Sequence, residues 1–213
     1  MSLTDKDLVP RTRKGNETRA RLLKAAEQVF SELGYHEASV VKITDAAGVG
    51  SGTFYLYFES KQTIFEELVL DLNRRVRHAM AEATTKSSNR LDAEKEGFRA
   101  FFTFTAEHPA LYRIIRQAEF VAPESLKMHY SKIVRGYIDG LTQAQASHEI
   151  SDIDPEVAAW ALMGIGELIG MRWVLWEQGE DDTPNTVPET VLDNMMMLIR
   201  RGLAPMKDKE NTP

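Results

Sequence analysis

The sequence of 213 residues contains no cysteine. This absence excludes disulfide bonds, thiol nucleophiles and zinc sites built on thiolates, and a reducing, cytoplasmic location fits it best. The N-terminus lacks the apolar run of a secretory signal, because charged residues interrupt it between Asp5 and Arg11. The five histidines show no paired spacing typical of metal ligands, so we expect neither a metal site nor another cofactor.

Positive charge is in deficit overall. Twenty-six Lys and Arg against thirty-two Asp and Glu give a net charge of −6, which excludes a uniformly cationic coat for nucleic acid. The deficit is uneven, since residues 1–61 hold nine basic and eight acidic side chains and the remainder holds seventeen and twenty-four. Over residues 11–24, six basic side chains accompany only Glu17. The two parts of the chain are therefore expected to meet different partners, although a solvated helix face also explains such a basic cluster.

One stretch is long and apolar enough to be compared with a membrane span. It covers residues 157–176, which as a helix would be about as long as a bilayer is thick. It contains Glu167 and Arg172, and two ionisable side chains inside a span would be costly in lipid. We therefore predict a buried helix of a water-soluble protein and no membrane partner.

No alternating strand pattern longer than a few residues is present, and apolar residues recur at helical spacing almost everywhere. The predicted fold is therefore all-α. For the first helix, Asn16 is a plausible N-cap and Gly34 stands where a C-cap would. The expected helices cover about 17–33, 39–47, 51–57, 60–80, 91–107, 109–120, 124–147, 155–176 and 187–203. The acidic, proline-containing segment 179–188 is expected to be a loop.

Residues 39–61, SVVKITDAAGVGSGTFYLYFESK, contain a short helix, a glycine turn and a second short helix, which are the parts of a helix-turn-helix. The apolar residues are expected to close a small core against the first helix; they are Ile43, Ala47, Val49, Phe54 and Phe58. The opposite face then presents small or hydroxylated groups that fit a major groove; they are Ser51, Gly52, Thr53, Tyr55, Leu56 and Tyr57. Glycines here allow close approach to DNA. Each glycine inside a helix also lowers helix stability by roughly 1 kcal/mol relative to alanine.

Together with the first helix, this stretch resembles the DNA-binding domain of the TetR family of transcriptional regulators over about residues 16–68. The matching motifs are TRARLLKAAEQVFSELGY and AGVGSGTFYLYFESKQTIF, with Gly48-Val49, Gly52-Thr53, Tyr55, Phe58 and Ser60-Lys61 at the family's spacing. Beyond residue 70 the resemblance is architectural. It implies an N-terminal three-helix DNA-binding domain followed by a larger helical ligand-binding and dimerisation domain. The expected divisions are 1–15 (flexible basic arm), 16–61 (helix-turn-helix domain), 62–205 (effector and dimerisation domain) and 206–213 (flexible tail).

The resemblance also implies DNA contacts. Ser39 would cap the second helix while its hydroxyl or backbone amide meets a phosphate, Tyr55 would contact a phosphate, and Lys61 would add a charge-assisted contact. The predicted DNA-binding residues are Ser39, Gly50, Ser51, Gly52, Thr53, Tyr55, Tyr57 and Lys61. Ordinary packing within the domain is the alternative for both tyrosines.

Two positions depart from the family's pattern. Gly50 stands where a capping serine is usual, so that Ser51 would shift the helix start, and Thr44 replaces a usual alanine. Either departure would alter which bases are read. For the basic arm over residues 11–14, two alternatives stay open: additional minor-groove or phosphate contacts, and a disordered tail.

The second part of the chain has more aromatic bulk than a small bundle needs, which favours an apolar ligand pocket with a few polar anchors. The predicted ligand-binding residues are Phe98, Phe101, Phe102, Tyr112, Arg116, Phe120, His129, Tyr130, Trp160, Glu167 and Trp173. For any single ring, ordinary core packing is the alternative. The expected ligand is a small apolar or aromatic effector.

Small residues line one face of the apolar helix, and a methionine-rich run follows near the C-terminus. These residues are Ala158, Ala159, Ala161, Gly164, Gly166 and Gly170, and the run 195–199. The resemblance implies that the last two helices of each subunit form a four-helix homodimer interface, and intrachain core is the alternative. Two recognition helices about 34–36 Å apart would then read the half-sites of a double-stranded DNA operator.

No nucleophile elbow, phosphate loop or zinc-protease helix is present, so we predict that the protein is not an enzyme. The predicted function is that of a ligand-responsive DNA-binding transcriptional regulator, a repressor released from a palindromic operator by its effector. The alternative is a helical small-molecule-binding protein or enzyme without operator recognition. An activator also stays open.

Overall fold

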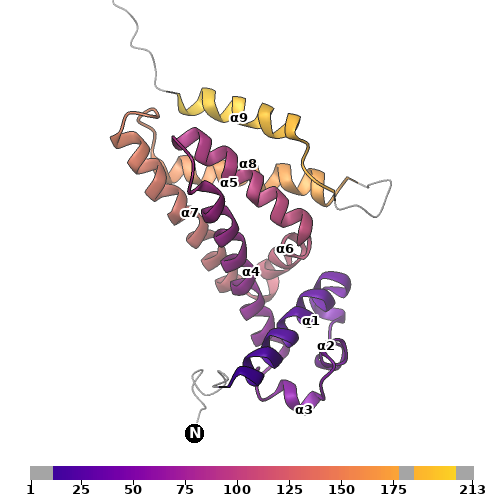
Figure 1. The fold of residues 1–213 in the computed structure, drawn as a ribbon. Coiled ribbons are helices and arrows are strands. Elements are labelled where there is room, and N and C mark those ends of the chain that lie inside the picture. Colours follow the sequence, from indigo (N-terminus) through magenta and orange to yellow (C-terminus); the bar gives the residue numbers. More distant parts are fainter. Residues whose placement is uncertain (1–11, 178–184, 205–213) are drawn as a thin grey trace, which may run out of the picture. The chain divides into compact units, whose positions relative to one another are not determined.

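The computed structural model describes residues 12–177 and 185–204, which contain nine α-helices and no strand (Figure 1). The predicted all-α fold is confirmed for these residues. The helices are α1 (Arg13–Glu37), α2 (Val40–Ala47), α3 (Ser51–Phe54), α4 (Lys61–Thr84), α5 (Arg90–Glu107), α6 (Ala110–Val121), α7 (Pro123–Ala146), α8 (Pro155–Val174) and α9 (Glu189–Leu203). Three predicted segments lie partly or wholly outside the described residues: the arm before residue 12, the loop over 178–184 and the tail over 206–213.

Helix α1 begins earlier than predicted. Thr12 is its N-cap, and the Thr12 hydroxyl accepts a hydrogen bond from the Gly15 amide at 3.1 Å. A threonine hydroxyl satisfies one of the amides that a first turn leaves unpaired, so the helix extends back past Asn16. The prediction of a cap at Asn16 is therefore wrong, and residues 13–15 belong to α1 rather than to the predicted arm.

The predicted end of the first helix corresponds to a kink within α1. Gly34 has φ 76° and ψ 166°, a backbone conformation that glycine adopts without the clash of a Cβ atom. The helix resumes briefly to Glu37, and the Ala38 amide donates to the Gly34 carbonyl at 3.1 Å. The kink lies directly before α2, so the conformation of Gly34 sets how the helix-turn-helix follows α1.

Helix α3 is shorter than the predicted 51–57. After Phe54 the chain continues in tight turns, in which the Leu56 amide donates to the Thr53 carbonyl and the Tyr57 amide to the Phe54 carbonyl. Such bonds span three residues instead of four and are common where a short helix ends. The predicted recognition helix is thus one α-helical turn extended by a tighter turn.

The chain divides into two compact units, Met1–Arg74 with Pro109–His129 and Arg75–His108 with Tyr130–Pro213. The division falls within α4, whereas the sequence placed it between residues 61 and 62. Helix α6 belongs to the first unit because it packs on α1, where the Gln117 side chain accepts a hydrogen bond from the Tyr35 amide. A helix distant in the sequence therefore completes the N-terminal unit.

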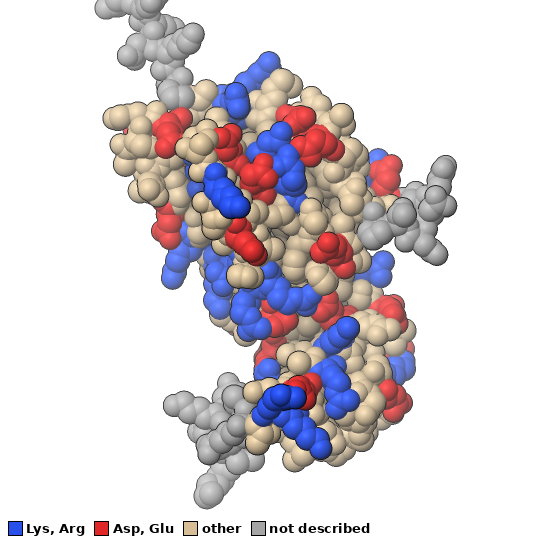
Figure 2. All heavy atoms as spheres, viewed as in Figure 1, with Lys and Arg blue, Asp and Glu red and all other residues tan. Residues whose placement is uncertain are grey.

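In the first unit, α1, α2 and α3 lie together (Figure 1), and aromatic rings are among the buried side chains of this unit. Phe30 and Phe65 meet edge to face with ring centroids 5.1 Å apart, and Phe54 and Phe58 are fully buried. On the outside, Lys and Arg side chains gather over α1 on the face shown in Figure 2. The unit thus combines an apolar centre with a locally basic surface.

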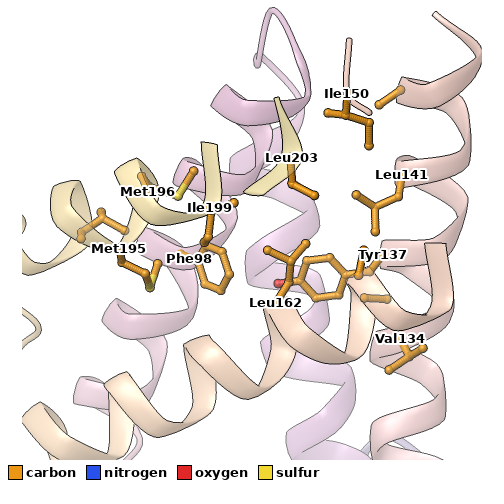
Figure 3. Close-up of a cluster of buried hydrophobic side chains, with 14 of the residues drawn as sticks. Phe98, Val134, Tyr137, Leu141, Ile150, Leu162, Met195, Met196, Ile199 and Leu203 are labelled. Atoms are coloured by element: carbon orange, nitrogen blue, oxygen red, sulfur yellow. The ribbon is translucent and has the colours of Figure 1, made fainter. Parts of the chain in front are cut away.

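The second unit has a core contributed by α5, α7, α8 and α9 (Figure 3). Phe98 of α5 lies at its centre, next to Ile199 of α9. A Cβ atom added to Gly166 would lie 2.6 Å from the Phe98 ring, so only glycine lets α8 approach α5 this closely. The small residue at 166 is thereby explained within one chain.

Helix α8 buries one face only. Ala159, Leu162 and Gly166 are buried, but Val157 and Leu168 are exposed, which corrects the prediction of a buried helix. Helix α8 is apolar over most of its length, with a mean hydropathy of 1.3 over a window of 18 residues, but only 39% of that window is buried. Among the described residues, α8 is the helix that is long and apolar enough to cross a membrane, judged by length and composition alone.

Candidate functional site

The described backbone of residues 39–58 forms a helix-turn-helix. Helix α2 ends at Gly48, which has φ 63°, and the Val49 amide donates to the Thr44 carbonyl at 3.0 Å. This left-handed glycine closes the last turn and sends the chain directly into α3. Ser39 is the N-cap of α2, as predicted, with its hydroxyl accepting from the Lys42 amide at 3.2 Å. Its phosphate contact stays a prediction.

Helix α3 is anchored on one side and open on the other. Phe54 is fully buried, whereas the next residue, Tyr55, is 56% exposed. Ser51 and Gly52 are also exposed, and Thr53 and Tyr57 are half-buried. Ser51, Gly52 and Tyr55 are therefore accessible to a partner, although each individual contact with DNA stays a prediction.

The two departures from the family's pattern have different consequences. Gly50 is the N-cap of α3 without a side-chain hydrogen bond, so the helix begins at Ser51. Thr44 is 1% exposed, and its hydroxyl donates to the Val41 carbonyl at 2.9 Å and lies 3.5 Å from the Ser51 hydroxyl. Thr44 is therefore a packing residue, and any effect it has on base reading passes through the position of Ser51.

Lys61 has a structural role that the sequence did not reveal. Its ammonium group donates to the Tyr35 carbonyl at 2.8 Å and to the Ala38 carbonyl at 2.9 Å, and lies 4.3 Å from the centroid of the Tyr35 ring. An ammonium group has three donors, so one remains for another acceptor. These hydrogen bonds tether the start of α4 to the α1–α2 corner, which is the stretch of chain where α1 ends and α2 begins. The predicted phosphate contact of Lys61 stays a prediction.

The same corner is held from a second side by α6. The Gln117 side-chain oxygen accepts the Tyr35 amide hydrogen, while the Gln117 side-chain nitrogen donates to the Arg113 carbonyl at 2.9 Å. Arg113 in turn donates to the Ser31 carbonyl at 3.3 Å. The peptide of Tyr35 is thus fixed by α6 through its amide and by α4 through its carbonyl.

The basic surface of α1 is partly neutralised. Arg19 pairs with Glu67 of α4 and lies 5.1 Å from the centroid of the Phe58 ring. Arg13 pairs with Glu17 within α1 at 3.0 Å. Partial burial lowers the pKa of Arg19, with a further contribution from the neighbouring Arg74 and an opposing one from Asp71. The predicted basic cluster therefore includes one cation, Arg19, that joins α1 to α4 within the unit.

The predicted ligand residues fall into both units. Tyr112 and His129 are buried in the first unit, where the Asn73 side chain donates to the His129 ring at 3.2 Å and to its carbonyl at 3.0 Å. Arg116 and Phe120 also belong to the first unit, and Phe120 is 83% exposed. These four residues therefore belong to the first unit, although the predicted effector domain, 62–205, included them.

Of the other seven predicted ligand residues, all in the second unit, six form two groups. Phe98, Phe101 and Phe102 pack as neighbouring rings on α5. The Tyr130 hydroxyl donates to the Glu167 carboxylate at 3.0 Å, and the Tyr130 and Trp160 rings lie 6.2 Å apart. The Trp173 ring lies beside Arg172 in sequence and in space, with the guanidinium 5.2 Å from the ring centroid. A role in ligand binding stays a prediction for all of them.

A pocket of about 260 Å³ lies in the second unit between α4, α5 and α7. Its lining combines apolar side chains, such as Met80 and Ile133, with charged ones, such as Arg90 and Glu94. None of the eleven predicted ligand residues lines it. The prediction relied on aromatic bulk, whereas Tyr137 is the one aromatic residue among those that line this pocket, and most of the others are aliphatic or charged.

Comparisons with known proteins agree with this geometry. The family model described as "Bacterial regulatory proteins, tetR family" matches residues 22–68. The chain is 34% identical to the "Uncharacterized HTH-type transcriptional regulator YdgC" of Bacillus subtilis over 76% of its own length and 84% of that protein. The chain belongs to the tetR family. The predicted family and the function of a DNA-binding transcriptional regulator are thereby confirmed.

Further relatives of this tetR-family protein have more specific names. It is 31% identical to the "Fatty acid metabolism regulator protein" of Bacillus subtilis, over 76% of this chain and 86% of that protein. The crystal structure of the transcriptional regulator FadR from Bacillus subtilis in complex with stearoyl-CoA is similar in fold, with a TM-score of 0.72 and 22% identity over 84% of this chain and 96% of that one. The relatives are named as regulators, and the absence of an enzymatic activity stays a prediction.

The predicted dimer face of the tetR-family protein divides in two. Ala158, Gly166 and Gly170 are buried within the chain, as are Met195 and Ile199, so for these the intrachain alternative holds. Other apolar residues of the same two helices are exposed; they are Val157, Trp160 and Leu168 on α8 and Met197 and Leu198 on α9. This second set is accessible to another subunit.

A signal for the pocket was present in the sequence. Gly136 and Gly140 stand four residues apart on α7, and Arg90 and Glu94 stand four apart on α5, so each pair shares a helix face. Small residues on one helix opposite charged residues on another indicate a place where a side chain or ligand enters. The pairs lie about fifty residues apart, and only the fold brings them together.

Proposed function

We propose that this protein is a repressor that binds a palindromic DNA operator as a homodimer and is released by a small effector. The observation that carries the proposal is the arrangement of α3, in which buried Phe54 fixes the helix while Ser51, Gly52 and Tyr55 remain exposed. A short, accessible helix with little side-chain bulk suits insertion into a major groove. A cytoplasmic location belongs to the same proposal, because the operator DNA would be there.

The DNA contacts in this proposal divide into positioning and reading. Tyr55, Ser39 and the remaining donor of Lys61 would meet phosphates, which set the register of the protein on the duplex. Ser51 and Thr53 would face base edges, since they occupy the start of the recognition helix. Tyr57, which is half-buried, would contribute through its hydroxyl.

A homodimer is supported by the exposed apolar residues of α8 and α9. Trp160 and Leu168 on α8 and Leu198 on α9 are exposed large apolar side chains. Contiguous apolar patches on a protein surface mark interaction sites, and a two-fold interface buries the same patch on both subunits. Two subunits would present two recognition helices, as a palindromic operator requires.

The effector is proposed to be a molecule with an apolar chain, held in the second unit. The Bacillus subtilis relative is named as a regulator of fatty acid metabolism, and the FadR structure of similar fold is a complex with stearoyl-CoA. The aliphatic walls of the pocket between α4, α5 and α7 suit such a chain. An effector acts by binding one conformation of the protein more tightly than the other.

Selection from a randomised oligonucleotide pool tests operator recognition. We expect enrichment of a palindrome with half-sites one helical turn apart. Affinity for the selected duplex is then measured between 50 and 200 mM salt, where several phosphate contacts should lower it by about a hundred-fold or more. A chain that enriches no sequence, or whose affinity barely changes with salt, would not be an operator-binding repressor.

A pair of variants controls for the fold. Tyr55→Phe removes only the exposed hydroxyl and should weaken operator binding about ten-fold, which equals about 1.4 kcal/mol. Phe120→Ala, in the same unit but outside the helix-turn-helix, should leave it unchanged. Both should unfold as the parent does. If Tyr55→Phe binds the operator like the parent, Tyr55 is not a phosphate contact.

A further inference from the structure

The pocket between α4, α5 and α7 has aliphatic walls. They are formed by Met80 and Ala81 of α4, Ala93 of α5 and Ile133 of α7. Its volume of about 260 Å³ is just below the range of about 300–1,000 Å³ that is usual for small-molecule sites. The pocket therefore suits one slender apolar group rather than a bulky polycyclic molecule.

Two glycines of α7 shape the pocket and its surroundings. Gly136 lines the pocket, and a Cβ atom added there would meet nothing within 4 Å, because the space beside it is open. At Gly140, one turn further along α7, a Cβ atom would lie 1.8 Å from the Arg90 guanidinium. Gly140 thus provides the space that Arg90 occupies.

Arg90 is held as a half-buried cation at this pocket. Its guanidinium pairs with Glu94 one turn along α5, and its backbone amide donates to the Glu149 carboxylate at 2.7 Å. Glu94 is 3% exposed, and this burial raises the pKa of its carboxyl group, while Arg90 has the opposite effect. The Arg90 Nε atom is buried and has no hydrogen-bond partner among the described residues. A buried donor without an acceptor is costly, so a ligand acceptor would be favourable there.

Cationic side chains outnumber acidic ones around the pocket. Arg77, Arg90 and Lys132 line it together with Glu94. Arg77 and Lys132 are exposed, whereas Glu94 is buried and paired. Three of the four charged side chains that line the pocket are therefore cationic, although the chain as a whole is acidic, and such a local cluster attracts anions.

We propose that this pocket binds an amphipathic anion, with its alkyl or acyl chain against Met80, Ala93 and Ile133 and its anionic group on Arg77 and Lys132. The inference rests on the proposed function, because it names the chemical class of the effector. A fatty acid and an acyl-CoA share this chemistry, since each joins an apolar chain to negative charge. A neutral alcohol of the same chain length lacks the group that the cations would bind.

Calorimetric titration of the ligand-free full chain with four probes tests the charge requirement. The probes are decanoate, decanoyl-CoA, decanol and CoA without an acyl chain. We expect at least one of the acyl anions to bind about ten-fold more tightly than decanol, and CoA alone to bind more weakly than either. The tighter of decanoate and decanoyl-CoA identifies the source of the anion. Equal binding of decanol and both anions, or binding of none of the four, overturns the proposal.

Charge variants locate the anionic group. Arg77→Gln combined with Lys132→Gln should weaken binding of the tighter acyl anion about ten-fold or more and leave decanol unchanged. Arg135→Gln removes an exposed cation of α7 that does not line the pocket, and should change binding less than about two-fold. If both proteins lose affinity equally, a general field rather than these two cations attracts the anion, and the assignment is wrong.

A size series at Gly136 locates the chain. Gly136→Ala adds one methyl group and should retain binding, whereas Gly136→Leu fills the open space and should abolish it. Circular dichroism and thermal unfolding establish that both variants fold. Undiminished binding to a folded Gly136→Leu protein overturns the proposal. Operator selection by the ligand-free chain separates the two hypotheses: selection without acyl-anion binding refutes only this inference, and acyl-anion binding without selection refutes only the repressor function.

Discussion

The two compact units differ in where they place polar side chains. The first unit exposes the groups of its candidate DNA surface, such as Ser51 and Tyr55, on a helix fixed by an apolar anchor. The second unit buries the Glu94 carboxyl group against Arg90, beside its pocket. The first therefore offers a surface to a large partner, and the second offers a pocket to a small one.

This difference has an energetic side. Among the described residues, the buried polar groups of the first unit are hydroxyls, an amide and an imidazole; they belong to Thr18, Thr44, Asn73, Ser125 and His129. The second unit buries a carboxyl group, and a buried charge is costly unless it is paired. Substitution of polar site residues should therefore change DNA binding in the first unit and stability in the second.

The largest effect is expected from the ion pair of the second unit. Arg90→Met leaves the Glu94 carboxyl group buried without its partner and should lower the free energy of unfolding by about 3–5 kcal/mol. Urea unfolding at neutral pH measures it. The double variant Arg90→Met/Glu94→Leu removes both charges and should recover most of the loss. If the single and double variants are equally unstable, the unit is stabilised by packing of the Arg90 side chain in the space beside Gly140 and not by its charge.

The next largest effect is expected at Lys61, which belongs to the predicted DNA surface yet binds two carbonyl groups of its own unit. This residue tests whether polar side chains of the first unit affect only DNA binding or stability as well. Lys61→Met should lower the free energy of unfolding by about 1.5–3 kcal/mol, because charge-assisted hydrogen bonds are lost. It should also lower the salt slope of operator binding by about 0.9, the value for one phosphate contact.

A matched lysine controls that experiment. Lys42 is exposed and donates to the Glu37 carbonyl at 2.9 Å, so Lys42→Met should change the free energy of unfolding by less than about 0.5 kcal/mol. If Lys61→Met weakens operator binding without changing the salt slope, Lys61 acts only as a tether of the α1–α2 corner, and its predicted phosphate contact is wrong.

The sequence predicted the first unit better than the second for a physical reason. The helix-turn-helix is contiguous over residues 39–61, and turn glycines such as Gly48 and caps such as Ser39 are local features. The pocket draws on residues from 77 to 137, and the pairing of Arg90 with the space at Gly140 exists only after folding. Even in the first unit, the tether of Lys61 and the position of α6 went unpredicted, because both depend on long-range packing.

Gln117 gives a smaller effect and shows how α6 supports the DNA surface. Gln117→Met removes the acceptor of the Tyr35 amide at the kink of α1, and should lower the free energy of unfolding by about 1–2 kcal/mol. Operator binding should weaken with it, since the same corner leads into α2. Gln62→Met, which removes an exposed hydrogen bond to Glu66, should leave both properties unchanged. No change in either property for Gln117→Met would mean that α6 does not position the corner.

The smallest effect concerns the surface charges of the second unit. Glu189, in the first turn of α9, is exposed and accepts hydrogen bonds from Arg99, which lower the pKa of its carboxyl group, with Lys95 close by at 3.6 Å. A lowered pKa means that the folded chain favours the charged form. This contribution to stability is therefore present above the pKa of the carboxyl group in the unfolded chain, near 4.5, and is lost as the pH falls through the pKa in the folded chain.

Glu189→Gln should slightly lower the melting temperature at pH 7 and have no effect at pH 2. Asp152→Asn, an exposed carboxylate outside this group, should show no such difference. At pH 2 the carboxyl group is protonated and the ion pair is absent. An effect of Glu189→Gln that persists at pH 2 would therefore come from lost packing and not from the exposed ion pair, whose contribution is small in any case.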